Sequence, residues 1–572
     1  MGGRAVRLDD LRAGGWAWAL WCAYLVWLGA MVSALAAASF LPGGVVHRFG
    51  ELFTVPAYRE ALIRTHIVGA ASTALVMMAG IGFLFSWRLR SAPGLSVLLR
   101  APLLLHGFPA ALAYLIVFGN AGWINRILQL LFGLSQPPLP LVFTPQALIL
   151  FFCVFGLPYF LACTVHGIGP EAADLEDTAR LLGCGPGEAF RRVTLPRLSA
   201  QLKTALSLVY VLAVGSLSVP MVIGGGKNAL ITAEIYGLVT TFADVSSACA
   251  LSLGFLATLA VPLILIDRWV DWAGRWVSTV QWTGPRRPAD RHSHRCRDSR
   301  LASRLLVRAA GGYQGAWLVL LCLLVLSPLY ASFVLDWGAG PLPESLTLQW
   351  YREITPQFWE SIRLSLLLSL GACLITLAIG VPLAVAWRFG PLPAKGVLKS
   401  LVLLPIGVPG FLWGLSLLVM AYRWWPTFAQ GPWILLAGQT FLALPFMLRV
   451  LMSYLEGFDE DYLAMAGILG AGRRGAARRV LLPMMLPAMG VGALLVFVRT
   501  FGESNLALMV APAQYPTAPL WLYQAIGISG IGTASVLEVF LVLIPLLVLF
   551  GWERWLRRRA PWAEVRAALP VG

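Results

Sequence analysis

Apolar stretches long enough to cross a lipid bilayer recur along the whole chain, and they restrict the fold more than any other feature. A helix needs about 20 mostly apolar residues to cross a hydrocarbon core of about 30 Å. Lipid offers the backbone no hydrogen-bond partners, so each such stretch is expected to be helical. Twelve stretches fit, at residues 16–41, 61–85, 99–118, 145–165, 200–223, 248–266, 317–335, 361–385, 400–421, 433–454, 487–510 and 534–550. The sequence therefore predicts an all-α integral membrane protein with about 12 transmembrane helices, and 58% hydrophobic against 12% charged residues agrees with it.

Positive charge is concentrated in alternate loops. The net charge of +16 is of a kind that nucleic-acid-binding proteins carry, but its distribution follows membrane topology. The arginines on one predicted side are Arg4, Arg7, Arg12, Arg88, Arg90, Arg100, Arg180, Arg191, Arg192, Arg197, Arg554, Arg557, Arg558 and Arg559. The other side carries few basic residues, namely Arg48, Arg59, Arg126, Lys227, Arg352 and Arg423. Basic loops stay in the cytoplasm, so the pattern predicts two cytoplasmic termini and no nucleic-acid partner.

The chain repeats itself. Matching residues recur at an offset of 300 in the early spans, 287 after the third span and 283 in the last span. Recurring pairs include Glu60 and Glu360, Trp87 and Trp387, Arg88 and Arg388, Pro109 and Pro409, Pro158 and Pro445, and Trp272 and Trp555. Changes of length fall in loops while spans stay aligned, as an internal duplication predicts. We expect two six-span halves, residues 1–266 and 313–572, which enter the membrane from the same side as parallel repeats.

A basic segment at 267–312 separates the two predicted halves. It contains ten arginines around Gly284-Pro285-Arg286-Arg287-Pro288. Its composition predicts a cytoplasmic linker without a core of its own. A second interpretation is that the segment binds anionic lipid head groups through this charge.

Each half contains one polar hairpin between two apolar stretches. Acidic residues, among them Asp174 and Glu176, suit a helix N-terminus, and Gly183 suits a left-handed helix end. Ala172, Leu175, Ala179 and Leu182 form one apolar stripe at helical spacing. The framework residues of the first copy are Asp177, Thr178, Ala179, Gly183, Leu195 and Pro196, and those of the second are Ala464, Met465, Ala466, Gly470, Leu482 and Pro483. A pair of hairpins with this framework indicates that something soluble docks there, whereas a less specific interpretation is two ordinary cytoplasmic loops.

The hairpin spacing resembles the EAA loop of ATP-binding-cassette (ABC) importer permeases. In that family the loop is a coupling helix that sits in a groove of the ATPase subunit. This sequence departs from the pattern at the glutamate position, which is Asp177 in one copy and Ala464 in the other. The glycine and the Leu-Pro pair are present in both copies.

The two-in-one arrangement resembles the fused permeases of the ferric iron, thiamine and spermidine importer group. The segments Pro109–Ala113 and Ala121–Arg126 resemble thiamine-type members. The resemblance implies a bacterial inner-membrane protein that translocates a small solute such as iron, thiamine or a polyamine. It further implies two copies of an ABC ATP-binding subunit, which carry ATP and Mg²⁺, and a periplasmic substrate-binding protein.

No ATPase or other catalytic site is expected in the chain itself. The glycine-rich stretch Gly224-Gly225-Gly226-Lys227 is not a nucleotide loop, because Met221 occupies the place of the first glycine and Asn228 follows the lysine. No metal-ligand spacing appears among the eight scattered cysteines. We therefore expect a transporter subunit that is not an enzyme and binds no cofactor or metal.

Charged residues at membrane depth are candidates for the transport pathway. Arg499 and Glu503 lie at i,i+4 in the eleventh predicted span and can pair along one helix face. The counterpart of Glu503 in the first half is Ser216. Pro109 and Pro409 interrupt spans and are expected to face the pathway or the interface between the halves. The alternative for Arg499 and Glu503 is a purely structural pair that neutralises itself.

A secondary transporter with 6+6 spans, driven by an ion gradient, is the competing function. Such a carrier needs no docking surface, so it gives no reason for two hairpins with one spacing. A proton-coupled carrier would also be expected to show more buried acids than Glu503 and Glu538. A channel or scaffold fits the duplicated hairpins poorly.

Overall fold

The computed structural model describes residues 16–39, 45–89, 105–168, 170–225, 229–279, 295–338, 340, 343–390 and 395–559. Several features of the predicted topology lie outside these ranges. They are the N-terminal arginines, Arg90, Arg100, Lys227, Arg286, Arg287 and the rest of 280–294.

The first half of the chain is helical. Its helices are α2 (Trp16–Ser39), α3 (Val45–Thr54), α4 (Pro56–Leu89), α6 (Phe108–Phe118), α7 (Trp123–Phe132), α8 (Pro145–Thr164), η2 (Val165–Ile168), α9 (Pro170–Leu181), α10 (Pro186–Ala189), η3 (Phe190–Thr194), α11 (Leu195–Arg197), α12 (Ser199–Val214), η4 (Pro220–Gly224), α13 (Ile231–Thr240) and α14 (Val245–Thr279).

The second half contains the same kinds of element. Its helices are α15 (Arg295–Ala331), α16 (Gln349–Arg352), α17 (Pro356–Phe389), α18 (Lys395–Gly407), α19 (Gly410–Trp424), α20 (Pro426–Ala429), α21 (Trp433–Glu456), α22 (Asp461–Ile468), α23 (Arg473–Ala476), η6 (Ala477–Leu481), α24 (Leu482–Phe501), α25 (Asn505–Val510), α26 (Ala518–Ile528) and α27 (Gly530–Arg559). A small antiparallel sheet pairs β1 (Val334–Asp336) with β2 (Ser345–Leu346).

The predicted helical membrane fold is confirmed, although not every span is continuous. Ten helical stretches among the described residues are long and apolar enough to cross a membrane, and one of them joins α6 and α7. The predicted fifth span corresponds to α12, which has only 16 residues. The predicted ninth span is divided into α18 and α19, because Pro409 has no N–H to continue a helix and stands at the N-cap of α19.

Helix boundaries recur at the offsets seen in the sequence. Helices α4 and α17 each have 34 residues and begin at Pro56 and Pro356. The π-helices η3 and η6, at Phe190–Thr194 and Ala477–Leu481, are 287 residues apart. Related sequences thus form related local structures in both parts of the chain.

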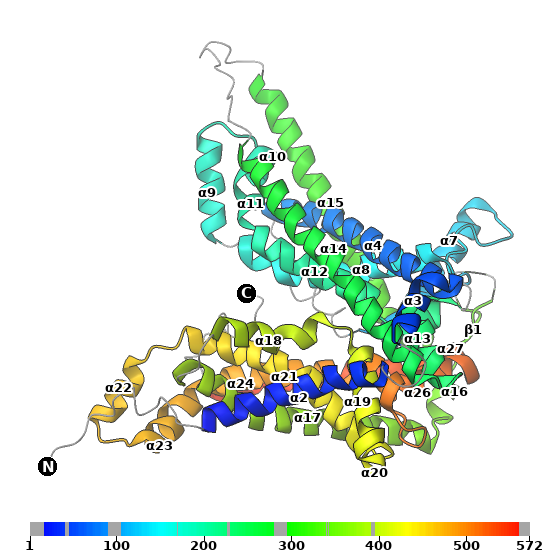
Figure 1. Ribbon diagram of the computed structural model, residues 1–572. Coiled ribbons are helices and arrows are strands. Elements are labelled where there is room, and N and C mark those ends of the chain that lie inside the picture. Colours follow the sequence, from blue (N-terminus) through cyan, green and yellow to red (C-terminus); the bar gives the residue numbers. More distant parts are fainter. Residues whose placement is uncertain are drawn as a thin grey trace.

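The helices form two arms that meet at one end and diverge toward the other (Figure 1). One arm ends in α9 and α10, and the other ends in α22 and α23. The first helix of each predicted half crosses to the opposite arm: α2 packs on α17 and α19 as well as α14, and α15 packs on α4 and α6. Tyr24 of α2 donates to the carbonyl of Val402 at 3.4 Å, and Tyr313 of α15 donates to that of Ala79 at 2.9 Å. Each arm therefore includes the first helix of the other predicted half.

The predicted linker is shorter than expected. Helix α14 continues to Thr279 and α15 begins at Arg295, so much of 267–312 is helical and extends two long helices. The apolar part of α14 ends before its polar extension, and the apolar part of α15 begins after its own. Hydropathy alone therefore placed the boundaries of the linker at 267 and 312.

Candidate coupling hairpins and central cavity

Both polar hairpins end their first helix in the same way. Gly183 follows α9 with a φ of +97°, and Gly470 follows α22 with a φ of +80°. The N–H of Cys184 donates to the carbonyl of Ala179 at 3.1 Å, and that of Ala471 donates to Ala466 at 2.9 Å. These are the backbone bonds of a Schellman motif, in which glycine adopts the left-handed conformation without steric cost. The same type of helix-ending turn therefore occurs in both hairpins.

The apolar side chains at the hairpin tips are exposed. Leu181 and Leu182 of the first hairpin are 89% and 69% exposed. Their counterparts at an offset of 287, Ile468 and Leu469, are 77% and 84% exposed. Of the predicted apolar stripe, Ala172 is buried and Ala179 partly buried, whereas Leu175 and Leu182 are exposed and available to a partner. Neighbouring exposed apolar residues of this kind mark a protein interaction surface.

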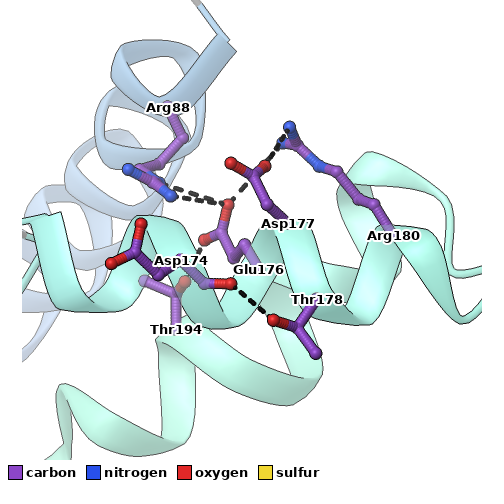
Figure 2. Close-up of polar contacts among 7 residues, drawn as sticks. All are labelled: Arg88, Asp174, Glu176, Asp177, Thr178, Arg180 and Thr194. Carbon is purple, nitrogen blue, oxygen red and sulfur yellow. Dashed lines mark hydrogen bonds and ion pairs between the residues drawn. The ribbon is translucent and has the colours of Figure 1, made fainter.

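Glu176 ties the first hairpin to the membrane helices (Figure 2). Its side chain has no exposed area, and Arg88, in the last turn of α4, donates to Oε2 from Nε at 3.2 Å and from Nη2 at 3.1 Å. Thr194, at the end of η3, donates to Oε1. Arg180 lies 3.6 Å from the same carboxylate. Two N–H groups of Arg88 on one carboxylate oxygen and the hydroxyl of Thr194 on the other together satisfy the buried charge.

The second hairpin replaces this polar cluster with apolar packing. At an offset of 287, Glu176 corresponds to Leu463 and Thr194 to Leu481, and both leucines are 2% exposed. Arg388, the counterpart of Arg88, instead forms an ion pair with Glu460 and donates to the carbonyl of Leu455 at 3.1 Å. The two hairpins are held to their arms by different chemistry at the same positions.

Half of the twelve predicted coupling residues are exposed. Asp177 is 66% exposed and pairs with Arg180 at 3.2 Å, while the hydroxyl of Thr178 donates to the carbonyl of Asp174 at 2.8 Å. Residues Asp177, Thr178, Gly183, Met465, Gly470 and Pro483 are exposed; Ala179, Leu195, Pro196, Ala464 and Leu482 are partly buried, and Ala466 is buried. The role of Glu176 as the anchor was not predicted, although its spacing of 18 residues from Thr194 recurs between Leu463 and Leu481.

Each hairpin continues directly into a helix that lines a central cavity. The chain runs from η3 through α11 into α12, and from η6 directly into α24. A cavity of about 360 Å³ lies between these helices, α8, and the interrupted segments near Gly107 and Pro409. A displacement of either hairpin therefore acts on the cavity wall without an intervening flexible loop.

Four of the five predicted pathway residues line this cavity. They are Ser216, Pro409, Arg499 and Glu503. The fifth, Pro109, is buried in the first turn of α6 and is not among the lining residues, although its neighbours Gly107 and Ala110 are. Pro409 also packs on Gly215, where an added Cβ would come within 2.7 Å of its ring. Helices α12 and α24 end at equivalent positions, after Val214 and after Phe501. Residues that follow each of these helix ends line the cavity.

The predicted pairing of Arg499 with Glu503 along one helix is wrong. Helix α24 ends at Phe501, and Glu503 accepts the N–H of Leu506 at 3.0 Å and that of Ala507 at 3.1 Å. Glu503 thus caps the short helix α25 and is only 2% exposed. Among the described residues, no ion pair or hydrogen bond links it to Arg499.

One side chain in the cavity wall joins the two halves. Asn505 accepts the backbone N–H of Leu217 at 3.1 Å and that of Ser218 at 3.0 Å. Asn505 and Ser216 both line the cavity, so these two hydrogen bonds join the halves beside it.

The fold and site define a class: a transport permease in which two surface hairpins continue into the helices around one cavity. The family described as "binding-protein-dependent transport system inner membrane component" matches residues 376–560. The molybdenum transport system permease protein ModB of Escherichia coli strain K12 is 30% identical over 223 residues, which cover 36% of this chain and 96% of ModB.

Two further relatives extend the comparison. The putative 2-aminoethylphosphonate transport system permease protein PhnV of Salmonella typhimurium is 27% identical over 238 residues, 40% of this chain and 87% of PhnV. The probable ABC transporter permease protein y4fN of Sinorhizobium fredii is 25% identical over 555 residues, 92% of each chain. The chain belongs to the binding-protein-dependent transport system inner membrane component family. It is a multi-pass membrane permease with the fold of type I ABC importers, and not an enzyme.

Proposed function

We propose that this chain is the complete membrane-spanning part of an ATP-driven importer, with both permease halves on one polypeptide. The halves are residues 1–266 and 313–572, and each presents one hairpin to one copy of an ABC ATP-binding subunit. The observation that carries the proposal is the pair of matching hairpins, at the same end of the molecule, with exposed apolar tips. Full-length similarity to a permease of the same size supports the fused arrangement.

The partners supply what the chain lacks. ATP and Mg²⁺ bind to the ATP-binding subunits, whose closure draws the hairpins together and moves α12 and α24 at the cavity. Binding of nucleotide drives this change only if it favours one conformation over the other. A substrate-binding protein delivers solute at the opposite end, in keeping with the family's description. The arginine distribution supports a bacterial inner-membrane location with both termini in the cytoplasm.

The names of the relatives do not support the substrates that the resemblance to fused importer permeases implies. Iron, thiamine and polyamines are cations, whereas the relatives are named for molybdenum and 2-aminoethylphosphonate transport. The transported solute is therefore proposed only as small and delivered by a binding protein.

Co-purification tests the proposed subunit role. Tagged full-length protein, extracted from its native membrane with a non-hydrolysable ATP analogue, is expected to bring down an ABC ATP-binding subunit. A variant with Leu181→Asp and Ile468→Asp should lose it, because two exposed leucine-sized contacts contribute about 1.5–3 kcal/mol each when buried. A preparation that never contains an ATPase would contradict the proposal.

A further inference from the structure

The central cavity has an unequal distribution of charge. Among its described lining residues, Arg499 and Glu503 are the charged side chains apart from the titratable His106. The carboxylate of Glu503 is occupied by the backbone N–H groups of Leu506 and Ala507 and is almost fully buried. The guanidinium of Arg499 is therefore the charged group in this lining that remains available to a ligand.

Arg499 has no protein partner in the part of the chain that the structure describes. It is half-buried, and neither a hydrogen bond nor an ion pair is formed by its side chain there. Its counterpart in the first half is the apolar Leu212, which lines the same cavity and is 38% exposed. A structural arginine at membrane depth normally finds a carboxylate or carbonyls, so this one is left for a ligand.

The neighbouring polar groups are hydrogen-bond donors. Asn505 uses its carbonyl oxygen on Leu217 and Ser218, which leaves its amide NH₂ group. Ser216 adds a hydroxyl to the same lining. A guanidinium, an amide NH₂ and a hydroxyl are a donor set suited to the oxygens of an anion.

We propose that Arg499 makes this cavity a passage for small oxyanions. The proposal rests on the proposed importer function and adds the substrate class: a tetrahedral oxyanion or a phosphonate, received by the guanidinium as it crosses between the halves. Cations are disfavoured next to the guanidinium, because like charges repel each other strongly in a site of low dielectric. The names of the molybdenum and 2-aminoethylphosphonate relatives agree with this class.

The local potential can be measured on the full-length permease alone. In a variant whose native cysteines are replaced, Leu212→Cys places one thiol in the cavity. The reaction rates of an anionic and a cationic methanethiosulfonate reagent are then compared. For unit charges about 8 Å apart in water, the Coulomb interaction corresponds to roughly a fivefold change in this ratio. Arg499→Gln should therefore lower the ratio of anionic to cationic rates by a factor of this order.

Two variants serve as controls. Arg499→Lys keeps the charge and should keep the ratio. Arg352→Gln removes an exposed arginine of α16 that does not line the cavity, and should leave the ratio unchanged. A ratio that is the same with Arg499 and with Gln in folded, monodisperse protein would overturn the proposal.

Protection distinguishes the ligand class. Millimolar molybdate or 2-aminoethylphosphonate should slow modification of the introduced cysteine at least threefold with Arg499 and not with Gln, and spermidine should not. Protection by spermidine, or equal protection in both variants, would overturn the proposal. The ATPase is absent from both assays, so these outcomes are independent of the co-purification test of the importer function.

Discussion

Glu176 illustrates what a single residue contributes and why the sequence analysis overlooked it. The family-like spacing drew attention to Asp177, which proves to be exposed, while the adjacent acid is buried between Arg88 and Thr194. Both residues sit in an acidic helix start, and one turn of helix decides which faces inward. Only the position of α4 against α9, a tertiary contact, identifies the anchor.

Replacing Glu176 by Leu should destabilise the first hairpin. The change leaves Arg88 without its buried partner, at a cost of about 3 kcal/mol. The thermal unfolding midpoint in detergent should fall, and ATPase binding should weaken. Asp177→Ala is the matched control: its pair with Arg180 is exposed and worth less than about 1 kcal/mol. Equal effects of the two substitutions would contradict the anchoring role.

The second hairpin provides a rescue for the first. Adding Ala173→Glu and Thr194→Leu to Glu176→Leu reproduces the arrangement of Glu460, Leu463 and Leu481. The new glutamate is placed to pair with Arg88 as Glu460 does with Arg388. The triple variant should recover most of the lost thermal stability. A triple variant less stable than the single one would show that the backbones of the two hairpins do not place these three positions equivalently.

At the scale of elements, the repeated hairpins were predictable because their signals are local. A glycine at a helix end and a Leu-Pro pair twelve and thirteen residues later require no tertiary information. The break after Phe501 was missed because hydropathy treats 487–510 as one apolar run. A signal was present: Gly502, followed by Glu503, Ser504 and Asn505, is a typical helix end and new N-terminus.

Bulky residues at Gly183 and Gly470 should uncouple transport. An added Cβ meets no atom within 4 Å at either site, so the effect comes from the positive φ alone. That conformation costs an L-residue about 1–2 kcal/mol, and a β-branched one more. The double variant Gly183→Val, Gly470→Val should insert normally yet lose binding-protein-dependent, ATP-driven uptake.

The control for this prediction lies two residues away. Gly185 is equally open to an added side chain but has a φ of −69°, so Gly185→Val should leave uptake nearly unchanged. Retained uptake in the double variant would refute the role of the helix-ending turns.

For the whole molecule, the sequence predicted the membrane class and the duplication but not how the arms are assembled. Hydropathy places α2 and α15 in the membrane, yet both are apolar on several sides and carry no information on which arm receives them. The structure shows each packed across to the other arm. The cavity is likewise formed by segments that are distant in sequence.

Asn505 should hold the two halves together beside the cavity. Loss of its two hydrogen bonds in Asn505→Ala removes about 1–2 kcal/mol from the state in which the halves meet there, roughly a tenfold shift between the two states. A cysteine at Ser216, in a cysteine-free background, should then react about tenfold faster with an impermeant reagent added outside intact cells. Asn505→Asp keeps an acceptor and should behave like the parent. Identical reaction rates of the introduced cysteine in Asn505→Ala and in the parent would contradict this role of Asn505.

The most direct test of the account is where the ATP-binding subunits touch the chain. Single cysteines at the equivalent positions Leu181 and Ile468 are combined with a short bifunctional cross-linker, and Phe132, exposed on α7 at the other end, serves as control. Both hairpin positions should cross-link to the co-purified ATP-binding subunit, each to a separate copy, while the position at Phe132 should not. A cross-link from Phe132 alone, or from neither hairpin, would contradict the assignment of the hairpins as the coupling elements.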